Sequence, residues 1–168
     1  MAPDESEKAR RKAYRLLALR SHSEGELEAK LKASGFSEAA MAGALARCRG
    51  LGYLDDGKYA RQRARDLAVN RLYGDRRISA DLRGKGISEA LLREAIAAAR
   101  EELGAGEAIG RLLAKQGAAP DEDLDRRRKE RLIRGLMARG FSRGLIFSVF
   151  KDKNTETGED GFHGDDGE

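Results

Sequence analysis

The residues in this sequence that could hold a metal ion or do catalytic chemistry are few. Acidic pairs stand at positions 55–56, 121–123 and 165–166, and carboxylates are ligands that Mg²⁺ accepts. The first two pairs fall where helices are expected to start, so helix capping explains them. The sequence contains no nucleophile elbow, phosphate-binding loop or dinucleotide fingerprint. We therefore expect a protein that is not an enzyme and holds no metal or cofactor.

Cysteine and histidine add no chemistry. Cys48 lies three residues after Leu45 on the apolar face of an expected helix, which predicts a buried hydrophobic side chain. His22 stands beside an expected helix start and is predicted to be a solvated turn residue. Neither His22 nor His163 has a partner at a metal-binding spacing, and a single cysteine cannot form an internal disulfide.

Basic residues carry the remaining functional signal. Residues 151–168 hold seven acidic and two basic side chains, a net charge of −5, whereas residues 1–150 carry +9. A basic body suggests a polyanionic partner, and phosphate contacts need charge and spacing rather than base-specific side chains. For any single cluster, an ordinary solvated surface is the alternative. The candidate contacts to such a polyanion are Arg11, Lys12, Arg15, Arg61, Arg65, Arg71, Arg76, Arg77, Lys85, Arg126, Arg127 and Arg134.

A repeated pattern of apolar residues, glycine and serine indicates how these side chains are positioned. In its first copy, apolar residues at 27 and 31 precede Gly35-Phe36-Ser37, and apolar residues follow at 41 and 45. The same order recurs around Gly86 and Gly140, 51 and 54 residues further along. Apolar residues four apart share a helix face, the glycine can end the helix with positive φ, and the serine can cap the next helix. The pattern predicts a stack of similar helical units, in which the basic clusters could align into one stripe.

The composition predicts an all-α protein, because Val, Ile and Thr together number only 10. We expect three tandem three-helix repeats, at residues 5–54, 55–104 and 105–151, that form an elongated, curved array. The acidic C-terminal tail, residues 152–168, is expected to be disordered. The nine helices are expected near residues 5–20, 23–31, 38–50, 56–72, 75–84, 88–103, 106–116, 121–139 and 142–151.

Several of these motifs, in this order and spacing, resemble the RecX family of bacterial regulators of the RecA recombinase. The resemblance covers about residues 8–150, and the tail after Lys151 lies outside the family pattern. It rests on Leu19-Arg20-Ser21-His22-Ser23 with Glu26-Leu27, on Gly52-Tyr53-Leu54-Asp55-Asp56 with Tyr59-Ala60, on Gly74-x-x-Arg77-Ile78, on Lys85-Gly86-Ile87 and on Arg139-Gly140-Phe141.

The resemblance implies a non-enzymatic regulator in recombination, DNA repair and the SOS response. Such a protein would bind the groove of the RecA–single-stranded DNA filament and modulate, mainly inhibit, its ATPase, strand-exchange and coprotease activities. The DNA would be contacted directly or through the filament. A free-standing nucleic-acid-binding protein built of tri-helical units is the alternative, and a helical scaffold for an acidic protein is a third reading. We expect a monomer without a membrane span or secretory signal, and therefore a cytoplasmic one.

Overall fold

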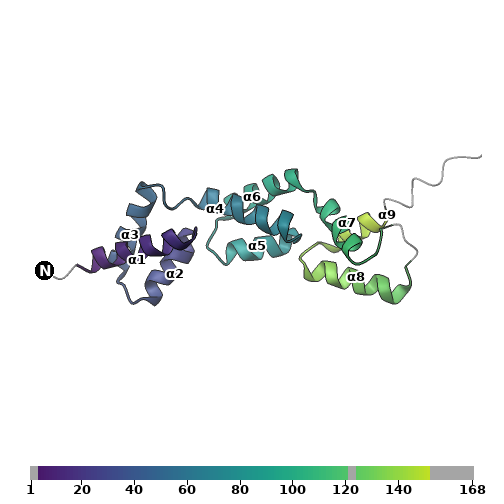
Figure 1. The fold of residues 1–168 in the computed structure, drawn as a ribbon, viewed down its shortest axis with the longest axis horizontal. Helices are drawn as coiled ribbons and strands as arrows, with labels where there is room; N and C mark the ends of the chain where they lie inside the picture. The colour runs from purple at the N-terminus through teal and green to yellow at the C-terminus, as the bar shows by residue number, and fades with distance from the viewer. Residues whose placement is uncertain (1–3, 121–123, 152–168) are drawn as a thin grey trace, which may run out of the picture.

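The computed structural model describes residues 4–120 and 124–151, which form an elongated row of helices and contain no strand (Figure 1). The helices follow one another in three groups of three, which we call the first, second and third units. Among these residues no helix has the length and apolar character needed to span a bilayer. The helices are α1 (Glu5–Leu19), α2 (Glu24–Ala33), α3 (Glu38–Gly50), α4 (Asp56–Arg65), α5 (Asp75–Arg83), α6 (Glu89–Glu102), α7 (Ala105–Lys115), α8 (Arg126–Ala138) and α9 (Arg143–Lys151).

Each unit has an apolar cluster of its own. The first cluster includes Leu27, Leu31 and Leu45, and Cys48 is fully buried in it, as the sequence predicts. Val69 packs against both the second and the third cluster, whereas the first cluster shares no described residue with its neighbour. The second and third units are thus joined through apolar side chains, and the first is not.

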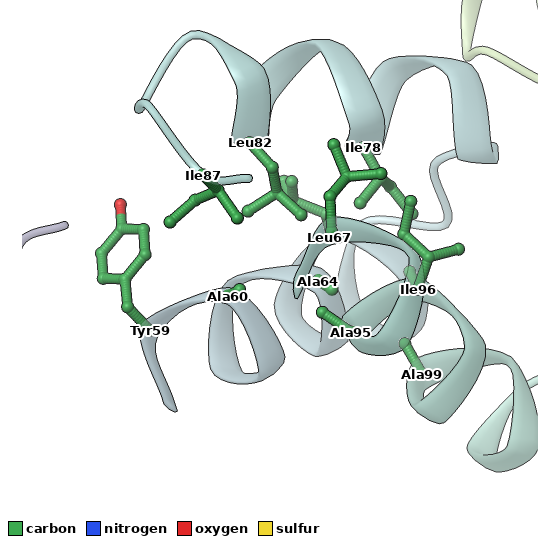
Figure 2. Packing of buried hydrophobic residues seen from close by; sticks show 12 residues of the cluster. Tyr59, Ala60, Ala64, Leu67, Ile78, Leu82, Ile87, Ala95, Ile96 and Ala99 are labelled. Atoms are coloured by element: carbon green, nitrogen blue, oxygen red, sulfur yellow. The ribbon is translucent and has the colours of Figure 1, made fainter. Parts of the chain in front are cut away.

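In the second unit, small residues lie where two helices contact each other and larger residues fill the rest of the apolar cluster (Figure 2). Ala60 and Ala64 on α4 face Ala95 and Ala99 on α6, and all four are buried. Small side chains at a helix contact allow the two axes to approach closely. The larger side chains of α5, such as Ile78, close the cluster from the other side. Every buried methylene here contributes about 0.8 kcal/mol by leaving water.

The repeated glycines and serines act as the sequence predicts. Gly35, Gly86 and Gly140 have φ of +82°, +76° and +94° and follow the second helix of each unit. The serine oxygens two residues later accept hydrogen bonds from the backbone of the next helix, at 3.3–3.4 Å. The recurring pattern therefore does mark equivalent turns in the three units.

The expected helix over residues 56–72 is interrupted. Regular α-helix ends at Arg65 and is followed by a π-helical segment, Asp66–Asn70, and then by Leu72 with φ of +54°. The amide of Arg71 accordingly donates to the carbonyl of Asp66, five residues back, at 3.1 Å. This wider turn redirects the chain, so that Leu67 lies in the second cluster while Leu72 lies in the third. The spacing of Leu67 and Leu72 predicts that both are buried on one face of a single helix. Periodicity alone therefore favours an uninterrupted helix.

The expected start of the helix over residues 121–139 is also wrong. Helix α8 begins at Arg126, and the carboxylate of Asp125 caps it by accepting from the amide of Arg128 at 2.9 Å. Asp121 and Asp123 lie outside the described residues, as does the tail over residues 152–168. Three aspartates at alternate positions are equally suited to capping by type, so the sequence could not choose among them.

Candidate functional site

Five of the twelve candidate basic residues are exposed but already ion-paired. The pairs are Arg11–Glu7, Arg61–Glu94, Arg65–Glu102, Arg71–Asp66 and Arg126–Glu130. Pairs on the surface contribute little to stability because water and salt screen them. A phosphate could compete for these arginines, but it would have to displace a carboxylate.

Another five candidates have no ion pair within the described residues. Arg15, Arg76, Arg127 and Arg134 are exposed, and Lys12 is half-buried. They are distributed along the array, with Lys12 and Arg15 on the first unit, Arg76 on the second and the other two on the third. These are the side chains most available to a polyanionic partner.

Lys85 and Arg77 have structural positions instead. Lys85 is only 22% exposed, and its Nζ donates to Glu26 of the first unit at 2.7 Å. Arg77 is exposed, but its guanidinium lies over the ring of Tyr73 at 4.3 Å and donates to the carbonyl of Ala138 at 3.4 Å. Both are candidate anion contacts by sequence, and the structure places them at the two junctions between units.

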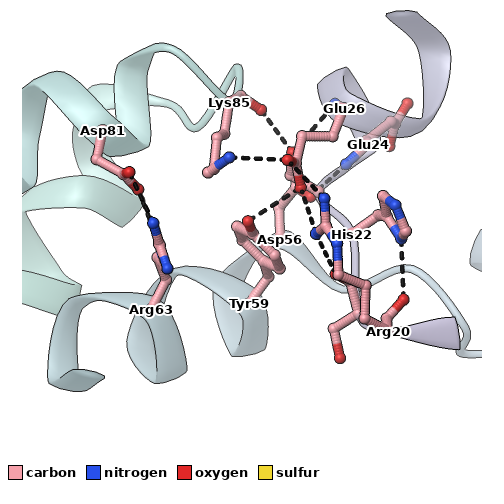
Figure 3. Close-up of polar contacts among 11 residues, drawn as sticks. Arg20, His22, Glu24, Glu26, Asp56, Tyr59, Arg63, Asp81 and Lys85 are labelled. Atoms are coloured by element: carbon pink, nitrogen blue, oxygen red, sulfur yellow. Dashed lines mark hydrogen bonds and ion pairs between the residues drawn. The ribbon is translucent and has the colours of Figure 1, made fainter. Parts of the chain in front are cut away.

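The carboxylate of Glu26 is the centre of the first junction, between the first and second units (Figure 3). It accepts from Lys85 at 2.7 Å, from the hydroxyl of Tyr59 at 3.0 Å and from Arg20 at 3.2 Å. Three donors from separate segments satisfy one largely buried acid, which is the condition under which a buried charge stabilises.

This network shifts two pKa values. Burial by itself raises the pKa of Glu26, but hydrogen bonds from Arg20, Lys85 and Tyr59 together lower it to about 2. Burial, together with the hydrogen bond to the Glu26 carboxylate, raises the pKa of Tyr59 to about 12. Both side chains therefore keep one protonation state, Glu26 charged and Tyr59 neutral, at every physiological pH. They hold the junction and are not poised for proton transfer.

The acidic pair at 55–56 also belongs to this junction. Asp55 caps α4 by accepting from the amide of Lys58 at 2.8 Å, as the sequence predicts. Asp56 accepts from the amide of Glu24 on α2 at 2.8 Å, which ties the start of α2 to the second unit. No group of three or more metal-ligating side chains occurs within residues 4–120 and 124–151.

The second junction, between the second and third units, is built from backbone. The amide of Gly74 donates to the carbonyl of Arg139 at 2.9 Å, and that of Arg76 donates to the carbonyl of Gly140 at 3.2 Å. A Cβ on Gly74 would overlap the Gly140 backbone, and a Cβ on Gly140 would lie 2.6 Å from both the Cβ and the amide nitrogen of Arg77. Only glycine permits this approach.

The aromatic ring of Tyr73 adds side-chain contacts to the second junction. Arg77 and Arg139 lie over this ring, at 4.3 and 5.8 Å from its centre. The guanidinium of Arg139 also donates to the carbonyl of Arg71 at 3.0 Å. Cation–π pairs of this kind each contribute about 0.5–1 kcal/mol at exposed sites.

The two junctions use equivalent positions. Ser23 and Gly74 are the residues that precede α2 and α5, and Lys85 and Arg139 immediately precede the repeat glycines. The hydroxyl of Ser23 donates to the carbonyl of Lys85 at 2.6 Å, as the amide of Gly74 does to that of Arg139. A Cβ on Gly35, in the first unit, would meet nothing within 4 Å. The repeat glycine thus ends a helix in every unit and forms a docking contact in the second and third.

The prediction that His22 is solvated is wrong. His22 is 4% exposed, and its Nδ1 lies 2.9 Å from the carbonyl oxygen of Arg20. Burial lowers the pKa of this imidazole. His22 lines a small hollow together with Asp55 and Tyr59 at the start of α4, whereas Arg20 and Ser21 remain exposed. The sequence gives no sign of this proximity. Glu26, three residues after Ser23, fits a capping box by sequence alone, and that pattern gives no sign of its role in the junction.

Comparison with known proteins shows the same architecture elsewhere. Residues 9–48 match the family model of the first three-helix domain of RecX, and residues 55–96 match that of its second three-helix domain. A solved RecX structure from Lactobacillus salivarius superposes with a TM-score of 0.76 over 90% of this chain and 97% of that one, at 21% identity. A second solved structure, of regulatory protein RecX, gives 0.75 over 89% and 74%, at 27% identity.

Sequence relatives extend the match into the third unit. Regulatory protein RecX of Syntrophotalea carbinolica is 34% identical over 84% of this chain and 93% of its own length. Regulatory protein RecX of Thermus thermophilus is 36% identical over 83% and 87%. The repeat, the fold and these relatives agree, and the chain belongs to the RecX family.

Proposed function

We propose that this protein is a non-enzymatic regulator that binds the groove of the RecA–single-stranded DNA filament. It would modulate, mainly inhibit, the ATPase, strand-exchange and coprotease activities of the filament. The observation that supports this most is family membership over 84% of the chain, including the third unit. RecA and single-stranded DNA are thus the proposed partners, in the cytoplasm and with the protein acting as a monomer.

The array has physical properties suited to this role. It is elongated, as a ligand of a long helical groove must be (Figure 1). Each unit also presents at least one exposed arginine without an ion pair within the described residues. We propose that residues 5–54, 55–104 and 105–151 act as the three binding units. A ligand that bridges neighbouring RecA protomers would slow turnover if it binds one filament state better than another.

The test is the DNA-dependent ATPase of the cognate recombinase, measured with and without this protein. We expect slower hydrolysis and slower strand exchange at near-stoichiometric or lower ratios. Unchanged rates at saturating protein would contradict the proposal.

A matched pair of variants tests the contact surface. Changing Arg15, Arg76 and Arg127 to Gln removes three arginines that make no ion pair with any described residue. Changing Arg61, Arg65 and Arg126 to Gln removes three paired ones. The net charge changes equally. We expect the first variant to bind filament or DNA more weakly and with lower salt sensitivity, by up to about 0.7 in log–log slope for each lost single-strand phosphate contact. Equal losses in both variants would favour non-specific attraction.

The net charge of +9 on residues 1–150 supports the second candidate, a free-standing nucleic-acid-binding protein. The two functions differ in what they require. The regulator needs RecA for tight binding, whereas the free-standing protein would bind single-stranded DNA equally well alone. Titration of labelled DNA with and without RecA separates them.

A further inference from the structure

A groove of about 640 Å³ lies on the third unit, between α8 and α9. Its apolar lining includes Ile133 and Met137 on α8 and Phe147 on α9. Met137 is 42% exposed, and the other two are half-buried, so their apolar surface remains in contact with water. A ligand with an apolar anchor would gain free energy by covering this surface.

The edges of the groove are strongly basic. Arg126, Lys129, Arg134 and Arg143 line it, and Glu130, which Arg126 already binds at 2.9 Å, is the one carboxylate among the described lining residues. Three positive charges therefore remain in excess. An uncharged ligand would leave them without counterions, so the groove suits an acidic ligand that carries an apolar anchor.

One segment of this chain is acidic and carries a single aromatic residue. Residues 159–168 read Glu-Asp-Gly-Phe-His-Gly-Asp-Asp-Gly-Glu, with five acids around Phe162. Phe162 is also the only large apolar residue among residues 152–168. One aromatic ring flanked on both sides by carboxylates matches an apolar floor flanked by guanidinium and ammonium groups.

The segment is also within reach. Phe162 follows Lys151, the last residue of α9, by eleven positions, which span up to about 36 Å when extended. Phe147 lies only four positions before Lys151, about one helical turn of 5.4 Å. A ligand tethered this closely has an effective concentration in the millimolar range for a short flexible linker, so even weak contacts would be populated.

A second apolar groove, on the first unit, lacks this match. It has a volume of about 520 Å³ and is lined by Tyr14, Leu17, Ala18, Ser21, Leu51 and Tyr53, none of which is charged. It also lies at the opposite end of the array from α9 (Figure 1). It therefore provides an internal control.

We propose that the α8–α9 groove is a docking site for an acidic peptide with one aromatic anchor, and that residues 159–168 of this chain occupy it. The ring of Phe162 would cover Met137 and Phe147, and the flanking carboxylates would pair with the basic edges. Docking would cover Arg126 and Arg134, two of the candidate anion contacts, and would make the segment a competitor of any polyanion there. The proposal does not depend on RecA.

The test uses the full chain with a single tryptophan as reporter. The sequence contains no tryptophan, so Phe162→Trp introduces a unique one. We expect its emission to be blue-shifted, and its quenching by acrylamide to be several-fold weaker, than in the free peptide of residues 152–168 with the same substitution. Adding Met137→Glu, or the pair Arg134→Glu and Arg143→Glu, should restore the values of the free peptide. Adding Leu51→Glu, in the other groove, should leave the protection intact.

Three results would overturn the proposal. Emission and quenching equal to those of the free peptide would show that the groove is not occupied by this segment. Protection that survives Met137→Glu and the double charge reversal, in proteins with unchanged circular dichroism, would place the ring elsewhere. Protection that disappears on dilution would assign the contact to a second copy and not to the same chain.

Discussion

The two junctions of this array lie at equivalent positions of the repeat but are stabilised by different kinds of interaction. At the first junction, a polar network centred on Glu26 joins units whose apolar clusters share no described residue. At the second, close glycine backbones and a tyrosine ring contacted by two arginines accompany an apolar contact through Val69. The first junction should therefore respond to charge and pH, and the second to added volume. The repeat therefore fixes the positions at which neighbouring units contact each other, but not the type of interaction that stabilises the contact.

The largest expected effect comes from adding one methyl group to the second junction. Gly140→Ala combines strain at φ of +94° with overlap against the Arg77 backbone, and we expect a loss of about 3 kcal/mol in the free energy of unfolding. Gly35→Ala is the matched control, because it has the same strain at +82° but open space around its Cβ. It should cost about 1 kcal/mol. Denaturant unfolding measures both, and equal losses would mean that the close approach is unimportant.

The next effect concerns the charge at the first junction. Glu26→Gln leaves Lys85 and Arg20 without their counterion, and we expect a loss of about 2 kcal/mol at neutral pH. The partial exposure of this site reduces the value below that of a fully buried ion pair. Denaturant unfolding at pH 7 provides the measurement.

The pH dependence sharpens the same comparison. The pKa of Glu26 falls from its ordinary value of 4.5 to about 2 on folding, so its contribution is fully present above pH 4.5 and is lost as the pH drops toward 2. The difference in stability between wild type and Glu26→Gln should therefore shrink over this range. A difference that stays constant from pH 7 to pH 2 would contradict the assignment of the network to the ionised carboxylate.

A smaller effect separates Lys85 from an ordinary surface cation. Lys85→Met removes a largely buried donor to Glu26, and we expect a loss of about 1.5 kcal/mol. Arg83→Met removes one partner of the exposed pair with Glu89 and should change stability little. Thermal unfolding of both variants, with titration of single-stranded DNA alongside, checks the two roles. If Lys85→Met weakens DNA binding and leaves stability unchanged, Lys85 is a DNA contact and not a structural residue of the junction.

The smallest effect tests the ring at the second junction. Tyr73→Leu keeps apolar bulk but removes the face on which Arg77 and Arg139 lie, so we expect a loss of about 1 kcal/mol. Tyr73→Phe keeps that face and should cost much less. Similar losses in the two variants would assign the effect to the hydroxyl, which makes no described hydrogen bond.

The sequence was a reliable guide where the interactions are local. The repeated glycines and serines located the ends and starts of helices because capping and positive φ depend on a few neighbouring residues. The burial of Cys48 followed from its place on an apolar helix face. The same reasoning placed the start of α8 too early, because several aspartates there suit a cap equally well. It also missed the π-helical segment after Arg65, which lies where Leu72 turns into the third cluster.

The sequence alone determined the class of fold, the number of units, their turns and their basic character, since each of these depends on residue type and short-range spacing. The tertiary structure alone decided which basic residues remain free. Lys85 and Glu26 are 59 positions apart, and only the docking of two units brings them to 2.7 Å. His22 is likewise buried beside the start of α4, more than thirty positions along the chain. Contacts between distant segments depend on three-dimensional packing, which determines whether a given charge faces a partner protein or the interior of the array.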